Sequence, residues 1–155
     1  MRYYGIVIAA IGIDQATKLW VRFHMHLGET LVIWQDVLHF TYYRNSGAAG
    51  STFQGYGRYF IIPAVLFVLY MAYARKQGQL KNGMAEAGAA LLVGGAIGNA
   101  IDRAVFGWVT DFVDNGRGIL NLADIAIQVG VLLLLADAVR DFIVSRRGRK
   151  SNPLT

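Results

Sequence analysis

The stretch VTDFVDNGRGILNLAD at residues 109–124 brings three carboxylates directly before an apolar run, IAIQVGVLLLLA at residues 125–136. The carboxylates belong to Asp111, Asp114 and Asp124. Such an apolar run predicts a helix in hydrocarbon, where an ionised carboxylate is costly and is usually kept for a function. The stretch therefore predicts a membrane protein with acidic groups collected near one end of a span.

The composition agrees with a membrane protein. Hydrophobic residues make up 55% of the 155 residues, and charged residues only 16%, against about 25% in soluble domains. The chain has no cysteine, which excludes disulfides, cysteine-bound metals and a thiol nucleophile. The net charge of +5 comes from basic residues beside the apolar runs, which indicates membrane topology rather than nucleic-acid binding.

Four apolar stretches approach the roughly 20 residues that a membrane-crossing helix needs. The distribution of Lys and Arg predicts that both termini are cytoplasmic. The expected fold class is a mostly α membrane protein, a four-transmembrane-helix bundle forming one integral domain over residues 1–155 in the cytoplasmic (inner) membrane. The expected spans are at about residues 3–20, 58–74, 84–106 and 122–144.

The segment at residues 24–57 is too polar to span and is expected on the outer side. ETLVIW at residues 29–34 and VLHFTYY at residues 37–43 predict two short strands joined by a turn at Gln35–Asp36. We therefore expect a small extracytoplasmic β-sheet between helices one and two, lying on the membrane surface. The basic residues 145–155 are predicted to form a disordered tail.

Polar residues from three spans are expected to converge at the outer ends of those spans. In the third span, GGAIGNAIDR at residues 94–103 combines small residues, which allow close helix approach, with polar groups that then face the bundle. Asp102 could serve the site or only join helices, and the pattern leaves both interpretations open. The converging residues are Asp14, Asn99, Asp102, Arg103, Asp111, Asn121 and Asp124.

Asp111 and Asp124 are the natural pair among these residues, because one follows the third span and the other opens the fourth. Two carboxylates close together in a poorly hydrated site cannot easily both ionise, so one keeps a proton. The ionised carboxylate can then take a proton from water while the neutral one polarises a carbonyl, as in aspartic proteases. Asp114 has no evident partner and is expected to be a solvated loop residue.

Five motifs in order resemble those of the lipoprotein signal peptidases, the type II signal peptidases of bacteria. The resemblance covers nearly the whole chain, and GGAIGNAIDR is its most specific part. The five motifs are DQATK at residues 14–18, NSGAAGS at 45–51, GGAIGNAIDR at 94–103, VTDF at 109–112 and NLAD at 121–124.

The resemblance implies cleavage of a signal peptide just before the lipid-modified cysteine of a diacylglyceryl prolipoprotein. It implies that Asp111 and Asp124 are catalytic, with no metal and no cofactor. It further implies a monomer in contact with membrane lipid, inhibition by globomycin-type peptides and no nucleic-acid partner. The residues expected to bind substrate or shape the site are Asp14, Asn45, Gly47, Asn99, Asp102, Arg103 and Asn121.

Three departures from the family pattern concern the packing of the substrate loop rather than the chemistry. Gly50 stands where the family usually has Phe, and Leu120 stands where Phe usually precedes the Asn. The loop between Asp111 and Asp124 is also short.

Other classes of function predict different patterns. A transporter or proton channel would hold its carboxylates near the membrane midplane, on interrupted helices. A Ser–Lys peptidase could use Ser46 or Ser51 with Lys18, but no G-x-S-x-G or S-x-x-K pattern is present. A metalloprotease could use only His24 and His26, without an H-E-x-x-H motif, and these histidines are expected at the surface.

Overall fold

A computed structural model describes the chain except for Asp36, Ala49, Ser51 and residues 151–155. Side chains are described as far as Arg146. The predicted turn at Gln35–Asp36 is thus described only at Gln35. The alternative nucleophile Ser51 and the last five residues of the predicted tail lie outside the described residues.

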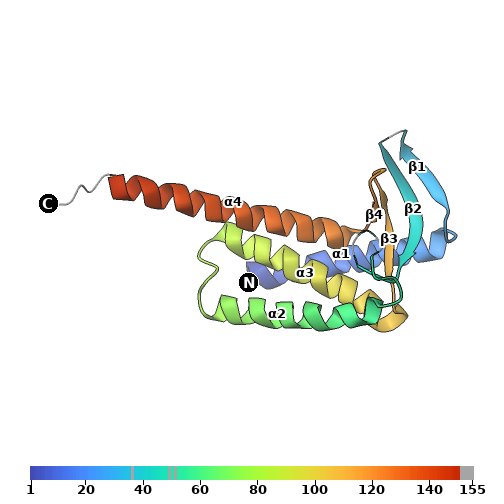
Figure 1. Cartoon of the computed structure of the whole chain (residues 1–155), viewed down its shortest axis with the longest axis horizontal. Helices are drawn as coiled ribbons and strands as arrows, with labels where there is room; N and C mark the ends of the chain where they lie inside the picture. Colours follow the sequence, from blue (N-terminus) through green and yellow to red (C-terminus); the bar gives the residue numbers. More distant parts are fainter. Residues whose placement is uncertain (36, 49, 51, 151–155) are drawn as a thin grey trace.

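Four long helices lie side by side, and a sheet covers one end of them (Figure 1). The start of α1 and the last turns of α4 lie toward the opposite end of the bundle. The helices are α1 (Arg2–His24), α2 (Ile61–Lys76), α3 (Gly83–Phe106) and α4 (Leu122–Lys150), with a short 3-10 turn η2 (Gly57–Phe60) before α2. The strands are β1 (Thr30–Trp34), β2 (Leu38–Asn45), β3 (Val109–Asp114) and β4 (Ile119–Leu120).

Three helical segments in the described part of the chain are long and apolar enough to cross a membrane: Gly57–Lys76, Gly83–Phe106 and Leu122–Arg146. They correspond to the second, third and fourth predicted spans. The helix α1 is not among them, because Asp14, Gln15 and Lys18 interrupt its apolar run. The crossing of the membrane by α1 therefore stays a prediction.

Glycines bring α3 against two of its neighbours. A Cβ at Gly94 would meet Ala10 of α1 at 2.7 Å, and a Cβ at Gly95 would collide with the carbonyl oxygen of Ala123 in α4. Farther along, Gly88 of α3 and Gly130 of α4 face each other backbone to backbone. Small residues at these contacts let the helix backbones approach, as the GGAIG pattern predicts.

Both ends of α3 are defined by single residues. The Asn82 side chain accepts the N–H groups of Met84 and Ala85, which are donors that a helix start leaves without partners. At the other end Gly107 has φ 82°, the left-handed conformation that suits glycine after a helix. This turn ends α3 and directs the chain into β3, which carries Asp111.

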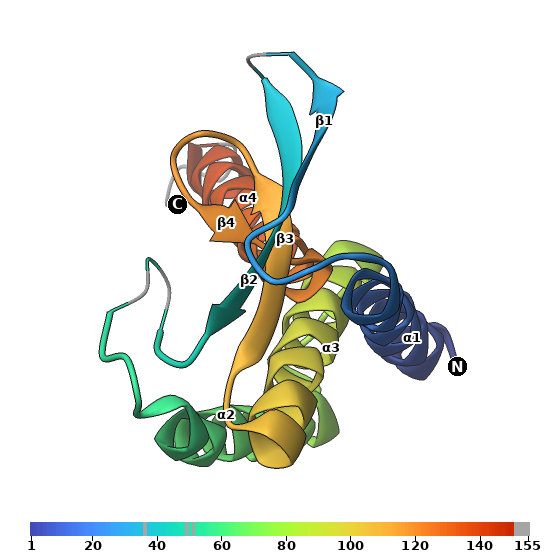
Figure 2. The same cartoon turned by 90° about the vertical axis from the view of Figure 1, so that its right-hand side faces the viewer.

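The sheet has the order β1-β2-β3-β4, with antiparallel neighbours throughout. Figure 2 shows it seen from beyond the helix ends. The prediction of a sheet built between helices one and two is therefore incomplete, because β3 and β4 follow α3. The stretch VTDFV is rich in Val, Thr and Phe, which are residue types enriched in strands. Val21, Met25, Tyr42 and Phe112 form a buried cluster that attaches the sheet to α1.

Two further expectations are corrected. The helix α4 continues to Lys150, so residues 145–150 are helical rather than a disordered tail; Arg and Lys are good helix formers that extend an existing helix. Asp114 is the last residue of β3 rather than a solvated loop residue. Its carboxylate accepts the Thr41 hydroxyl at 3.2 Å and the Gly116 N–H at 2.9 Å.

Candidate active site

Asn121 and Asp124 cap each other at the start of α4. The Asp124 N–H donates to Asn121 Oδ1 at 2.9 Å, and the Asn121 N–H donates to Asp124 Oδ2 at 3.3 Å. This reciprocal pair is a capping box, which satisfies N–H groups that the helix start would otherwise leave free. The sequence NLAD therefore fixes the Asp124 carboxylate at the first turn of α4.

Asp111 lies in β3, where it pairs with Tyr43 of β2, and it is 2% exposed. Its two carboxylate oxygens accept from two amides. Asn121 Nδ2 donates to Oδ1 at 2.6 Å, and Asn45 Nδ2 donates to Oδ2 at 3.1 Å. Asn121 thus contacts both Asp111 and Asp124, and it brings together the two carboxylates that the sequence paired.

Burial, followed by the negative charge of Asp124, raises the pKa of Asp111 to about 7. The donors Asn121 and Asn45 and the charge of Lys18 act in the opposite direction but do not cancel this effect. Near neutral pH both the protonated and the ionised form of the Asp111 carboxyl are therefore populated. A carboxyl in this state can both donate and accept a proton, which is what acid–base chemistry requires.

A buried polar cluster connects Asp124 to α1. Asn99 of α3 donates from Nδ2 to Asp124 Oδ1 at 2.8 Å, and its Oδ1 accepts from Lys18 Nζ at 2.9 Å. Lys18 is fully buried and pairs with Asp14 at 2.9 Å. Asp14 in turn accepts the N–H of Ala123 at 2.9 Å. The cluster therefore joins α1, α3 and the start of α4 beside the carboxylate pair.

Asp102 holds the start of β3. It is fully buried, and its Oδ2 accepts the N–H of Thr110, the neighbour of Asp111, at 2.9 Å. Gln15 donates to its Oδ1 at 3.2 Å, and Arg22 lies 3.5 Å from the same oxygen. These partners favour a structural role for Asp102, in which its carboxylate holds the start of β3 against α1 and α3.

Arg103 connects α3 to the loop after β2. Its Nη2 donates to the Gly47 carbonyl at 2.9 Å, and its guanidinium lies over the Phe60 ring at 5.5 Å. Its Nε is buried and has no hydrogen-bond partner within the described residues. The Gly47 N–H donates to Asn45 Oδ1, and a Cβ on Gly47 would collide with the Thr52 carbonyl.

The structure accounts for two of the departures from the family pattern. Gly50 has φ 67°, a conformation that a Phe would adopt only with strain. The short segment between the aspartates forms a hairpin of β3 and β4, with Gly116 at φ 76° in the turn. Leu120 lies half-buried in β4 and continues the strand without an aromatic ring.

All nine predicted site residues lie at the junction of the sheet with α1, α3 and α4. Sequence reasoning missed four others that complete the junction: Gln15, Lys18, Arg22 and Thr110. The signal for Lys18 was available, because an acid and a lysine at i and i+4 in an apolar helix predict a buried pair. The nine are Asp14, Asn45, Gly47, Asn99, Asp102, Arg103, Asp111, Asn121 and Asp124.

The residues considered for other chemistries have other contacts. The Ser46 hydroxyl contacts Gln54 and accepts the Gly55 N–H, while Lys18 is held in the acidic cluster. The His24 ring stacks on Trp20 with centroids 5.0 Å apart. Within the described residues, no group of three or more His, Asp or Glu side chains is arranged to hold a metal ion.

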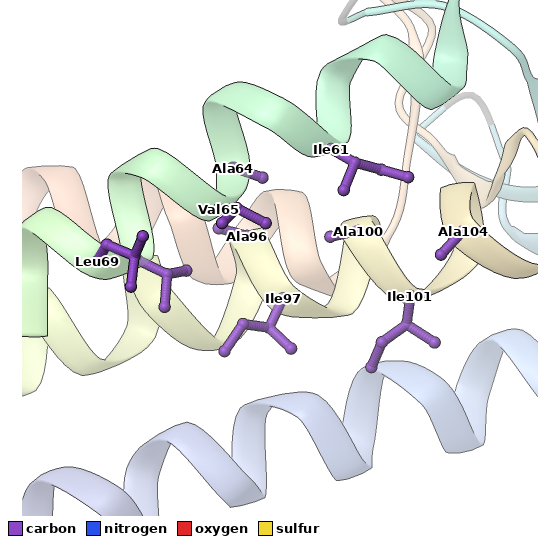
Figure 3. A pocket seen from close by; sticks show the side chains of 10 residues that line it. Ile61, Ala64, Val65, Leu69, Ala96, Ile97, Ala100, Ile101 and Ala104 are labelled. Carbon is purple, nitrogen blue, oxygen red and sulfur yellow. The ribbon is translucent and has the colours of Figure 1, made fainter.

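An apolar groove of about 340 Å³ runs between α2 and α3 (Figure 3). Ile61, near one end, follows Phe60, on which Arg103 stacks. The groove therefore begins beside the polar site and continues along the helices. Its lining is Ile61, Ala64, Val65, Val68, Leu69, Ala96, Ile97, Ala100, Ile101 and Ala104.

Comparison with known proteins gives consistent results. The family model of signal peptidase (SPase) II matches residues 6–140. The lipoprotein signal peptidase of Lactococcus lactis subsp. cremoris is 40% identical over 146 residues, covering 88% of this chain and 94% of that protein. The lipoprotein signal peptidase of Brevibacillus brevis is 38% identical over 144 residues, covering 91% of this chain and 97% of that protein.

The fold is also that of a solved protein. The structure of a bacterial membrane enzyme, determined by the in meso method at 2.3 Å resolution, superposes with a TM-score of 0.86. It is 28% identical in sequence, and the match covers 91% of this chain and 89% of that chain. With the family model matched over most of its length, the chain belongs to the signal peptidase II family.

Proposed function

We propose that Asp111 and Asp124 are the catalytic pair of an aspartic endopeptidase that removes the signal peptide from diacylglyceryl-modified prolipoproteins, cutting before the lipidated cysteine. Membership of the signal peptidase II family makes the chain a bacterial membrane peptidase that processes lipoprotein precursors. The observation that carries the aspartic assignment is that one residue, Asn121, contacts both carboxyl groups. Its side-chain amide donates to the buried Asp111 carboxylate, and its main-chain N–H donates to the half-buried Asp124 carboxylate.

The two carboxyl groups would divide the acid and base roles. Asp111, with its raised pKa, supplies the proton to the scissile carbonyl oxygen. Asp124, which accepts N–H groups from Asn99 and Asn121, takes a proton from the attacking water. The tetrahedral intermediate then collapses as a proton returns to the leaving amine, which releases the signal peptide.

The remaining site residues would shape the site and hold the substrate. The free Nε of Arg103 and the amide of Asn45 are donors suited to peptide carbonyls in a poorly hydrated place. Asp14, Asn99, Asp102 and Asn121 orient the two aspartates, and Gly47 keeps the loop close to Arg103. The same donors would hold globomycin-type peptides, and the mechanism requires no metal and no cofactor.

We further propose the membrane placement. The helix α1 crosses the membrane with the other three as one integral domain over residues 1–155, a monomer in the cytoplasmic membrane. The Lys and Arg residues favour cytoplasmic termini, with the sheet outside. A single Cys at Gln79, in the exposed loop before α3, tests this, because the chain has no other Cys. Labelling of that Cys by an impermeant reagent added outside intact cells would show that this loop lies outside and would contradict the proposed orientation.

The groove between α2 and α3 would take an acyl chain of the substrate. The lining of the groove is aliphatic and lies next to Phe60, on which Arg103 stacks, so the groove offers an acyl chain an apolar surface beside the polar site. A substrate approaching sideways through the bilayer could thus keep its lipid in the groove while the scissile bond reaches the aspartates.

The decisive experiment is cleavage of one prolipoprotein with and without diacylglycerol on its cysteine, by the wild type and by Asp111→Asn. We expect cleavage only of the lipidated substrate by the wild type. Equal cleavage of both substrates would contradict lipid-dependent recognition. Loss of activity on adding a metal chelator would contradict the two-aspartate mechanism.

A transporter is the other class considered from the sequence, and it is not favoured. The carboxyl groups lie at the sheet end of the bundle, and α3, which passes beside them, is a continuous helix. Transporter sites usually lie near the membrane midplane at interrupted helices.

A further inference from the structure

Lys18 determines which way the Asn99 side-chain amide points. A lysine ammonium has three N–H donors and no acceptor, so only an oxygen can face it at hydrogen-bond distance. The atom of Asn99 that lies 2.9 Å from Lys18 Nζ is therefore Oδ1. The Nδ2 group must then face the other way, where it meets Asp124 Oδ1 at 2.8 Å.

The orientation of this amide matters to the carboxylate pair. An N–H group directed at Asp124 stabilises a negative charge there. The reversed amide would direct its oxygen at Asp124 and would favour a protonated carboxyl instead. A single rotation of Asn99 would thus remove the N–H donor that faces Asp124 and put an acceptor in its place.

Stability alone does not explain the burial of Lys18. Its side chain is fully buried with Asp14 and Asp102, at 2.9 and 3.6 Å. Removing such charges from water costs several kcal/mol per ion, and well-packed apolar residues in their place are often as stable or more stable. The Gly94 and Gly95 contacts already join α3 to α1 and α4 without charged groups.

We infer that Lys18 is a positioning residue of the peptidase: acting through Asn99, it keeps a hydrogen-bond donor on Asp124 and so selects Asp124 as the base. This inference rests on the proposed two-aspartate function. The other charged groups around Lys18 and Asp124 are Asp14 and Arg22 from α1, Asp102 and Arg103 from α3, and Asp111 from β3.

The test removes the ammonium without leaving an unpaired buried charge. The variant Asp14→Asn/Lys18→Met neutralises both partners of the closest pair, and Asp14→Asn alone keeps the ammonium for comparison. Since one acid–base group is worth about 10²–10⁴-fold, we expect kcat of the double variant to fall about 10- to 100-fold below that of Asp14→Asn. Because binding of the lipidated substrate does not use Lys18, KM should stay within about threefold.

A double-mutant cycle separates positioning from a merely structural role. If Lys18 acts through Asn99, adding Lys18→Met to a protein that carries Asn99→Ala and Asp14→Asn should change kcat by less than about threefold. Equal losses with and without the Asn99→Ala substitution, or no loss in either case, would overturn the inference. The acid limb of the pH–kcat profile should also move to higher pH in the double variant, because Asp124 loses the N–H donor of Asn99. An acid limb at the same pH in both proteins would count against the inference.

Lys18→Arg and Lys18→Gln provide a second comparison that does not depend on the folding of the double variant. Arginine is also a pure donor and keeps the Asn99 oxygen facing it, whereas glutamine can accept from a reversed amide. We expect Lys18→Arg to retain about tenfold more kcat than Lys18→Gln, and equal values would overturn the inference. Failure of the proposed function would instead appear as activity retained by Asp111→Asn and Asp124→Asn.

Discussion

The two sides of α3 are built differently. On one side α3 meets α1 and α4 through glycines and a largely buried set of ions and amides. On the other side it meets α2, where Ala74 is the one buried residue of that helix within the described chain. There the contact leaves the apolar groove of Figure 3. The first contact is close and polar, and the second is open and apolar.

This difference separates the chemistry from the substrate's lipid. Carboxyl groups that must keep a fixed geometry need partners that cannot shift, and close backbone contacts together with capped helix ends provide them. A lipid chain needs only an apolar surface that can adapt. Changes on the polar side should therefore impair catalysis, and changes on the α2 side should mainly alter recognition of the lipid.

The largest effect is expected at the carboxyl pair. Asp111→Asn or Asp124→Asn should each lower kcat at least about a hundredfold, because neither carboxyl alone can both activate water and protonate the carbonyl. The amide has nearly the same shape, so the variants should remain folded in detergent. Turnover assays combined with thermal unfolding check this. If either variant keeps more than about a hundredth of wild-type activity, the aspartate that it replaces is not part of the catalytic pair.

The next effect tests the close contact of α3 with α4. Gly95→Ala sets a Cβ against the Ala123 carbonyl, next to Asp124, and overpacking of this kind costs about 1–3 kcal/mol. We expect a lower unfolding temperature and reduced kcat. Gly12→Ala is the matched control, because a Cβ at Gly12 has nothing within 4 Å and alanine favours a helix. Equal unfolding temperatures for the two variants would contradict the interpretation that α3 and α4 need a close backbone contact at Gly95.

A third prediction follows from the raised pKa of Asp111. The acid role needs a protonated Asp111, so kcat should fall above pH 7, by up to about tenfold per pH unit. Between pH 3.8 and about 7 the folded protein keeps a proton that an unfolded chain releases, so stability should decrease as pH rises through this window. The difference in unfolding temperature between pH 5 and pH 8 should be smaller in Asp111→Asn than in wild type. An equal difference in the two proteins would contradict the raised pKa.

The sequence predicted the helices, and which polar residues gather at the sheet end of the bundle, better than the contacts between them. Apolar runs of about 20 residues and glycines at helical spacing are local signals, and α2, α3 and α4 followed them. The joining of β3 to β2 depends on contacts between residues about 70 positions apart, such as Tyr43 with Asp111, and no local pattern specifies them. The pairing of Lys18 with Asp14 is local, but its contact with Asn99 could not be predicted for the same reason, because the two residues are 81 positions apart.

The smallest effect is expected in the groove. Ala100→Leu should fill part of it, and the kcat/KM of a substrate with long acyl chains should fall only about threefold to tenfold. The loss is small because a chain that leaves the groove enters lipid that is equally apolar, so only packing and orientation are lost. A short-chain substrate should be less affected, and kcat for both substrates should change little. Ala9→Leu, on an exposed part of α1, is the matched control. Equal losses for long and short chains would show that the substitution disturbs α3 itself and that the groove does not hold the lipid.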